Sequence, residues 1–161
     1  MSVITTRVIF LLVIFLTNFA YCQGPYAAGM GSSRQGQLGI GNTKQIYIPV
    51  PAESFNSLDV YAIEPGSQWT LILTTQNLVY VIGLDAFGQL GMGSLNSIYI
   101  NPTLNPFMMN TIGICTGGSM SGNEGYSYFY NSTQLYATGS NTYGQLGVGD
   151  KWSEVISQCC M

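Results

Sequence analysis

The residue types that most often carry enzyme chemistry are sparse in this chain. It has no histidine, which excludes a Ser-His-Asp or Cys-His arrangement and any zinc site built on imidazole. A pair of carboxyl groups is one arrangement for acid–base catalysis without histidine. Such a pair could form in space, but the acidic residues here are scattered singly in the sequence, and we interpret them as solvated surface charges. They are Glu53, Asp59, Glu64, Asp85, Glu124, Asp150 and Glu154. We therefore predict no catalytic residues, no metal site and no cofactor.

Two glycine-rich stretches have the backbone freedom that a phosphate-binding loop requires. They are Gly29-Met-Gly31 and Gly117-Gly118. Neither has the lysine or the strand–helix setting of such a loop. We interpret them as turn glycines.

Glycine instead dominates a twelve-residue pattern that occurs three times without gaps. The copies are Gly31-Ser-Ser-Arg-Gln-Gly-Gln-Leu-Gly-Ile-Gly-Asn42, Gly83-Leu-Asp-Ala-Phe-Gly-Gln-Leu-Gly-Met-Gly-Ser94 and Gly139-Ser-Asn-Thr-Tyr-Gly-Gln-Leu-Gly-Val-Gly-Asp150. Successive copies lie 52 and 56 residues apart. This spacing indicates an array of similar units, and such an array favours binding by a scaffold over chemistry in one pocket.

The Gly-Gln-Leu-Gly core of each copy is predicted to be a structural turn. Its glycines would bend the backbone without a Cβ clash, its leucine would point inward, and its glutamine would bind backbone groups that the turn leaves unpaired. The residues concerned are Gly36, Gln37, Leu38, Gly39, Gly88, Gln89, Leu90, Gly91, Gly144, Gln145, Leu146 and Gly147.

Short β-strands surround each copy of the pattern. Residues 69–75 and 78–83 flank Gln76-Asn77, and residues 125–130 and 134–139 flank a second turn, so both read as hairpins. Further strands are predicted at residues 46–48, 60–63, 98–100 and 112–115, and Pro49 and Pro102 are expected to end pairing. Each full unit then has about four strands, the size of a propeller blade. The first unit has only residues 26–30 before its pattern, so we expect its outer strands to be missing or replaced.

The N-terminus has the layout of a secretory signal. Arg7 precedes an unbroken apolar run from residue 8 to residue 16, and Ala20-Tyr-Cys22 suits cleavage before Gln23 or after Ala20. The run is short for a membrane span, so we predict a signal peptide at residues 1–22 and a secreted protein without a stable membrane span. An uncleaved signal that anchors the protein in a membrane is the alternative.

Charge and cysteine content limit the partners and the cross-links. The only basic residues are Arg7, Arg34, Lys44 and Lys151, so nucleic-acid binding is not expected. After signal removal three cysteines remain, and Cys115 is predicted to pair with Cys159 or Cys160, or to stay unpaired. Asn131-Ser-Thr133 is an acceptor sequence for N-glycosylation at a predicted hairpin tip.

Five aromatic residues are candidates for a protein-binding face, because aromatic side chains dominate interface hot spots. They are Tyr47, Trp69, Phe87, Tyr99 and Tyr143. Packing between blades is the alternative role for each, and it is the one we favour.

The repeated Gly-x-x-x-x-Gly-Gln-Leu-Gly-x-Gly pattern, preceded by a short tyrosine-bearing strand, resembles the repeat of the regulator of chromosome condensation family. The resemblance covers nearly all of residues 23–161. In that family seven such repeats usually close into a seven-bladed β-propeller. Trp69 stands where a family repeat has histidine. The resemblance implies an all-β fold, here a partial β-propeller of about two to three four-stranded blades.

The functional expectation follows from this fold and from the N-terminus. We predict a truncated, secreted, non-enzymatic propeller-repeat protein that binds another protein and self-associates through open blade edges. One alternative is a regulatory factor that promotes nucleotide exchange on a small GTPase, the activity of the best-known family member. The other is a secreted enzyme inhibitor, because a secreted relative inhibits β-lactamases.

Overall fold

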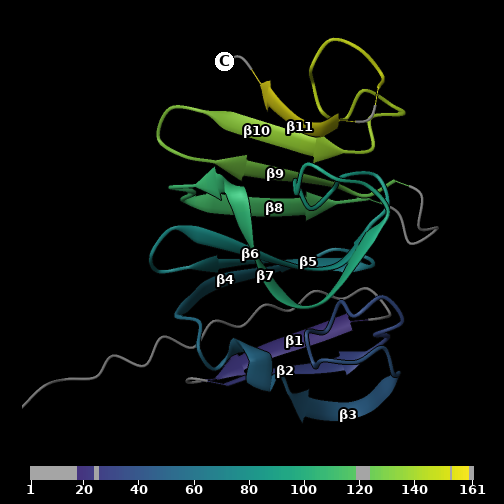
Figure 1. The fold of residues 1–161 in the computed structure, drawn as a ribbon, viewed down its shortest axis with the longest axis vertical. Helices are drawn as coiled ribbons and strands as arrows, with labels where there is room; N and C mark the ends of the chain where they lie inside the picture. The colour runs from purple at the N-terminus through teal and green to yellow at the C-terminus, as the bar shows by residue number, and fades with distance from the viewer. Residues whose placement is uncertain (1–17, 24–25, 119–123, 153, 160–161) are drawn as a thin grey trace, which may run out of the picture.

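The computed structural model describes residues 18–23, 26–118, 124–152 and 154–159. These residues form three antiparallel β-sheets that are stacked one upon another, in the order of the chain (Figure 1). One short 3-10 helix, η1 (Glu53–Phe55), follows the first sheet. None of the helical segments in the described residues is long and apolar enough to cross a membrane. The predicted all-β class is confirmed.

The first sheet has three strands in the order β1-β2-β3. They are β1 (Asn18–Gln23), β2 (Tyr26–Gly31) and β3 (Ile46–Pro51). β1 supplies a strand before the first glycine pattern, and it lies mostly within the segment predicted to be the signal peptide. The rest of that segment, residues 1–17, lies outside the described residues.

The second and third sheets have the four strands predicted for a full unit. The second, in the order β4-β5-β6-β7, contains β4 (Val60–Pro65), β5 (Trp69–Thr74), β6 (Leu78–Asp85) and β7 (Ser97–Met109). The third, in the order β11-β10-β9-β8, contains β8 (Gly113–Gly117), β9 (Tyr126–Tyr130), β10 (Leu135–Gly139) and β11 (Glu154–Cys159). Each glycine pattern begins at the end of the strand before the last in its sheet, β2, β6 or β10, and leads to the last strand, β3, β7 or β11.

The expectation that proline ends strand pairing is wrong for both strands concerned. Pro49 lies inside β3, and Pro102 lies inside β7. Each proline falls where the register with the neighbouring strand shifts, between Ile46 and Val50 in one strand and between Tyr99 and Thr103 in the other. Because β3 and β7 are edge strands and the prolines lie at irregularities, the missing amide hydrogens cost no regular ladder bond.

The apolar core lies between the sheets. Every residue of β5 is buried, because the second sheet is covered on both faces. Its Ile72 joins Phe55 and Ile82 on the face toward the first sheet. Leu71 and Leu73 lie on the opposite face, in a cluster that includes Phe129 of the third sheet. A continuous apolar run therefore serves a doubly covered strand, as in other buried sheets.

Candidate functional site

The three glycine patterns form one recurring turn, and all three turns lie on the same side of the stack (Figure 1). The glycine before each Gln-Leu pair has a left-handed backbone, with φ of 77° at Gly36, 81° at Gly88 and 78° at Gly144. The amide of the glycine three residues later donates to its carbonyl at 2.8–3.1 Å, from Gly39, Gly91 and Gly147 respectively. Glycine is required there because a left-handed backbone strains any side chain with a Cβ.

The glutamine and the leucine of each turn have separate structural roles. The glutamine Oε1 accepts a hydrogen bond from the backbone amide two residues before it, at 2.8–2.9 Å; the pairs are Gln37 with Gln35, Gln89 with Phe87, and Gln145 with Tyr143. The leucines Leu38, Leu90 and Leu146 are all buried. These contacts link the side chains of the Gly-Gln-Leu-Gly core to the backbone of the turn and to the apolar core.

Sequence reasoning missed a buried polar side chain in the third position of every copy. In the third copy Asn141 Oδ1 accepts from the amide of Leu146 at 2.9 Å, and its Nδ2 donates to the carbonyl of Asp150 at 2.9 Å. In the first copy the Ser33 hydroxyl donates to the carbonyl of Asn42 at 3.0 Å. The signal was present, because this position is Ser, Asp or Asn in the three copies.

Asp85 holds this position in the second copy and is completely buried. Its Oδ1 accepts from the amide of Leu90 at 2.8 Å, while its Oδ2 has no hydrogen-bond partner. Burial raises the pKa of Asp85 to about 6, and the Leu90 hydrogen bond opposes that increase.

Asn105 on β7 links the second turn to the second sheet through hydrogen bonds. Its Nδ2 donates to the carbonyls of Leu90 and Gly91 at 2.8 and 3.1 Å, and its Oδ1 accepts from the amides of Phe107 and Met108 at 2.8 and 3.1 Å. All the hydrogen-bonding capacity of this buried amide is thereby used. The sequence repeat does not reveal the role of Asn105, because the residue that makes the corresponding bond to the first turn is a serine. There the hydroxyl of Ser54 donates to the carbonyl of Gly39.

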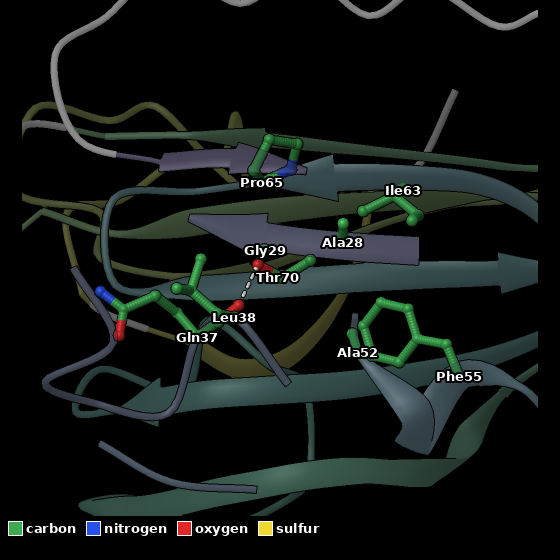
Figure 2. A pocket seen from close by; sticks show the side chains of 9 residues that line it. All are labelled: Ala28, Gly29, Gln37, Leu38, Ala52, Phe55, Ile63, Pro65 and Thr70. Atoms are coloured by element: carbon green, nitrogen blue, oxygen red, sulfur yellow. Dashed lines mark hydrogen bonds between the residues drawn. The ribbon is translucent and has the colours of Figure 1, made fainter. Parts of the chain in front are cut away.

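Each of the first two turns also contacts the next sheet. The hydroxyl of Thr70 donates to the carbonyl of Gln37 at 2.8 Å, and the hydroxyl of Thr138 donates to the carbonyl of Gly88. Figure 2 shows the first of these contacts, at the edge of a cavity lined by Leu38 and Phe55 among others. The cavity measures about 10 Å³, whereas small-molecule sites usually exceed about 300 Å³. The seam between these sheets is therefore a packing contact.

The acidic residues and the short glycine stretches occupy separate places in the part of the chain that the structure describes. The described residues contain no group of three or more Asp, Glu, Cys or His side chains that could hold a metal. Gly29 and Gly117 lie in β2 and β8, so the prediction that they are turn glycines is wrong. A Cβ at Gly29 would meet Leu38, and one at Gly117 would meet the ring of Tyr126. Both glycines make room for a neighbouring side chain.

The predicted pairing of Cys115 with Cys159 does not suit the sheet order. Cys115 lies on β8 and Cys159 on β11, at opposite edges of the third sheet. Three strand spacings separate them, about 14 Å in total, which exceeds the reach of a disulfide. The thiol of Cys115 is free and exposed, and Cys160 lies outside the described residues.

Asn131 lies at the tip of the β9–β10 hairpin, as the sequence suggests. Its Oδ1 accepts from the amide of Thr133 at 2.9 Å, from the Thr133 hydroxyl at 3.1 Å and from the amide of Gln134 at 2.9 Å. Three donors therefore hold the side-chain carbonyl in place at an exposed turn.

The five aromatic candidates separate into packing and surface residues. Trp69 is buried in the core between the second and third sheets, and Tyr99 packs against that core. Phe87 is half-buried, whereas Tyr47 is 83% exposed and Tyr143 is 73% exposed. A hydrogen bond to Glu124 and the charge of that residue raise the pKa of Tyr143.

Among the residues that the structure describes, the largest group of exposed apolar side chains lies on the edge strand β7. This group was not predicted from the sequence. Five residues of β7 are 39–54% exposed: Ile98, Ile100, Leu104, Phe107 and Met109. Residues 97–109 contain no charged side chain. An apolar, uncharged strip on a sheet edge is a candidate protein-binding surface.

Comparison with known proteins agrees with the repeat pattern and the fold. Residues 29–73 match the family model described as regulator of chromosome condensation (RCC1) repeat. The chain is 31% identical over 118 residues to a protein RCC2 homolog of Danio rerio, covering 73% of this chain and 23% of the relative. It is 30% identical over 141 residues to the regulator of chromosome condensation of Xenopus laevis, covering 84% and 32%.

A solved structure shows the same architecture. The structure of Prp20p from Saccharomyces cerevisiae matches with a TM-score of 0.75 and 14% identity, covering 90% of this chain and 36% of that one. At this identity the match shows the fold alone, which is that of a partial β-propeller. The chain spans less than a third of each of the two curated relatives described.

Proposed function

The chain belongs to the regulator of chromosome condensation repeat family, and we propose that it is a non-enzymatic scaffold that binds another protein through β7. The observation that carries this proposal is the strip of five exposed apolar side chains on an uncharged edge strand. Such a strand offers both apolar contacts and unpaired backbone groups to a partner. The repeated turns then serve to hold the sheets, and β7 with them, in a fixed position.

The relatives support a binding role in general terms. Prp20p is described as having binding properties to Gsp1p and histones, and another related structure is that of Kap60 bound to yeast RCC1. Protein binding is thus a recorded property of proteins with this fold. The partner of this chain is a separate question, because those proteins extend far beyond the part that matches.

Substituting aspartate for Phe107 is expected to weaken partner binding at least tenfold. The side chain is 54% exposed, so the change places a charge in the strip with little effect on the core. The test is to recover partners from source cells with the full chain, purify them, and measure their affinity by calorimetry. Sedimentation velocity should fix the oligomeric state first, because open sheet edges also favour self-association.

Tyr47→Asp is the matched control, since Tyr47 is an exposed aromatic residue on the edge strand of another sheet. Equal loss of affinity in both variants, or none in Phe107→Asp, would contradict a site on β7. Stimulated release of a labelled guanine nucleotide from a small GTPase would instead support the exchange alternative. The described residues provide no specific observation in favour of an enzyme inhibitor.

We also propose that the protein enters the secretory pathway, where Asn131 is glycosylated. The exposed turn and the fixed side-chain carbonyl of Asn131 support this modification. Expression of residues 1–161 in eukaryotic cells should give a secreted product that shifts in mass on glycan removal and in the variant Asn131→Gln. Cleavage before Gln23 would also remove most of β1, which intact-mass measurement would reveal. Cytosolic product without a glycan would contradict the proposal.

A further inference from the structure

The third position of the glycine pattern makes the same kind of bond in the two flanking repeats. Ser33 donates its hydroxyl hydrogen to the carbonyl nine residues later, that of Asn42. Asn141 donates an amide hydrogen to the carbonyl nine residues later, that of Asp150. Both side chains are buried, and each bond ties the third residue of its pattern to the twelfth.

In the second repeat, the third position of the pattern has a carboxylate oxygen, which accepts hydrogen bonds, where the first and third repeats have a hydrogen-bond donor. Asp85 makes one of the two hydrogen bonds that Asn141 makes. Its Oδ1 accepts from the amide of Leu90, as Asn141 Oδ1 accepts from the amide of Leu146. Its Oδ2 takes the place of the Asn141 amide nitrogen, and it is buried without a partner. The backbone carbonyl nine residues after Asp85 belongs to Ser94. The end of the turn is held beside Asp85 by a hydrogen bond of 2.7 Å from the Asn96 amide to the backbone carbonyl of Asp85.

We propose that Asp85 is a proton-dependent latch: its protonated carboxyl donates from Oδ2 to the Ser94 carbonyl and closes the second turn, and ionisation releases that bond. The proton comes from solvent and returns to it, and no other bond changes. In the ionised state Oδ2 cannot donate, so the buried carboxylate is left with the hydrogen bond from the Leu90 amide alone.

Neighbouring charges do not account for the raised pKa of Asp85. Between Trp69 and Met109, which includes β5, β6, the turn and β7, Asp85 is the only charged residue and the other titratable groups are Tyr80 and Tyr99. The elements packed against this region add Tyr61 and Glu64 on β4, Glu53 on η1 and Cys115 on β8, together with the tyrosines of β9 and β10. Arg34 lies in the first turn, which contacts Ile100, and Glu124 precedes β9. The pKa of Asp85 responds to desolvation first and to the Leu90 amide second.

The latch would control the seam between the second and third sheets. The same turn places Leu90 in the core cluster of that seam and offers the Gly88 carbonyl to Thr138 of the third sheet. Loosening the turn therefore weakens the contact between two sheets, beyond the loop itself. Neutral pH would favour the loosened form and mildly acidic pH the closed form.

The sign of the effect follows from proton linkage. The pKa of Asp85 is about 6 in the folded chain and 3.8 in the reference state, so the folded state binds the proton more tightly. Stability from Asp85 is complete below pH 4 and is lost as the pH rises to about 6. A difference of about two pH units corresponds to a change of roughly 100-fold in the unfolding equilibrium constant.

The test is to measure urea unfolding of the full chain between pH 4 and pH 8 and to compare Asp85→Asn and Asp85→Ser with the wild type. Asparagine and serine carry the donors that the flanking repeats use, so both variants should lose this 100-fold component and be more stable than wild type at pH 7. Asp59→Asn, at an exposed carboxyl, should retain it. This control also retains the smaller contribution of half-buried Glu64, whose pKa is raised by burial.

Carboxyl-carbon NMR on the wild type tests the latch without any variant. The expected result is a resonance that titrates near pH 6, is absent from Asp85→Asn, and changes together with the exchange protection of the Leu90 amide. An Asp85 resonance that titrates near pH 4, or an unfolding profile in Asp85→Asn that parallels the wild type, would overturn the proposal.

Discussion

Replacing Gly83 with alanine is expected to lower the free energy of unfolding by about 3–5 kcal/mol, enough to unfold a marginally stable domain. Gly83 has a φ of 100°, which by itself costs a residue with a Cβ about 1–3 kcal/mol. The added Cβ would also lie 2.3 Å from the carbonyl oxygen of Gln68 and 2.6 Å from the Cα of Trp69. These are backbone atoms of the paired strand, so no side-chain rotation relieves the clash. Urea unfolding at constant pH, followed by circular dichroism, measures the loss.

Gly144→Ala is the matched control for this prediction. Gly144 also has a left-handed backbone, with a φ of 78°, but a Cβ there would meet no heavy atom within 4 Å. Its cost should therefore be the backbone strain alone, about 1 kcal/mol. Similar losses in the two variants would show that backbone strain dominates and that the close approach of β5 to β6 at Gly83 is relaxed in solution.

Local patterns predicted the units of this fold because each unit repeats the same local chemistry. The hairpin of β5 and β6 is marked by two apolar runs around Gln76-Asn77, and Asn77 has the positive φ, 61°, that such a tight turn requires. The glycines of the repeated turn are equally visible, since only glycine accepts their backbone conformation without strain. Information within about twelve residues was sufficient for these elements.

Features that depend on contacts between distant segments were not predictable in the same way. Pro102 remains within β7 because the register against β6 shifts at that point, and this depends on the partner strand. Gly29 resembles a turn glycine in the sequence, but its role is to leave space for Leu38, which packs against it in the fold. The exposed strip on β7 has the apolar composition of a buried strand. Its exposure follows from the position of β7 at the edge of the sheet.

Polar residues of the candidate site were missed for a related reason. Asp85 looks like a solvated surface charge in the sequence, and its burial depends on the second turn being closed between two sheets. The three aligned copies already contained the signal, because this position is always a short polar residue. Repeats within one chain thus act as an internal comparison, and the exception among them is informative.

Replacing Trp69 with alanine is expected to cost about 3–5 kcal/mol, the range for deleting a buried aromatic side chain. The indole is 2% exposed and belongs to the core cluster between the second and third sheets. Its Nε1 donates to the hydroxyl of Ser127 at 3.2 Å, so truncation also leaves a buried hydroxyl without its partner. Urea unfolding followed by circular dichroism measures the change without depending on tryptophan fluorescence.

Trp152→Ala is the matched control for the packing role of Trp69. Trp152 is 78% exposed, so its removal should change the unfolding free energy by no more than about 0.5 kcal/mol. If Trp69→Ala were equally mild, Trp69 would not be a core residue, and the seam between the sheets would have to open in solution. A large loss at Trp69 alone would establish that the tryptophan standing where family repeats have histidine holds neighbouring sheets together.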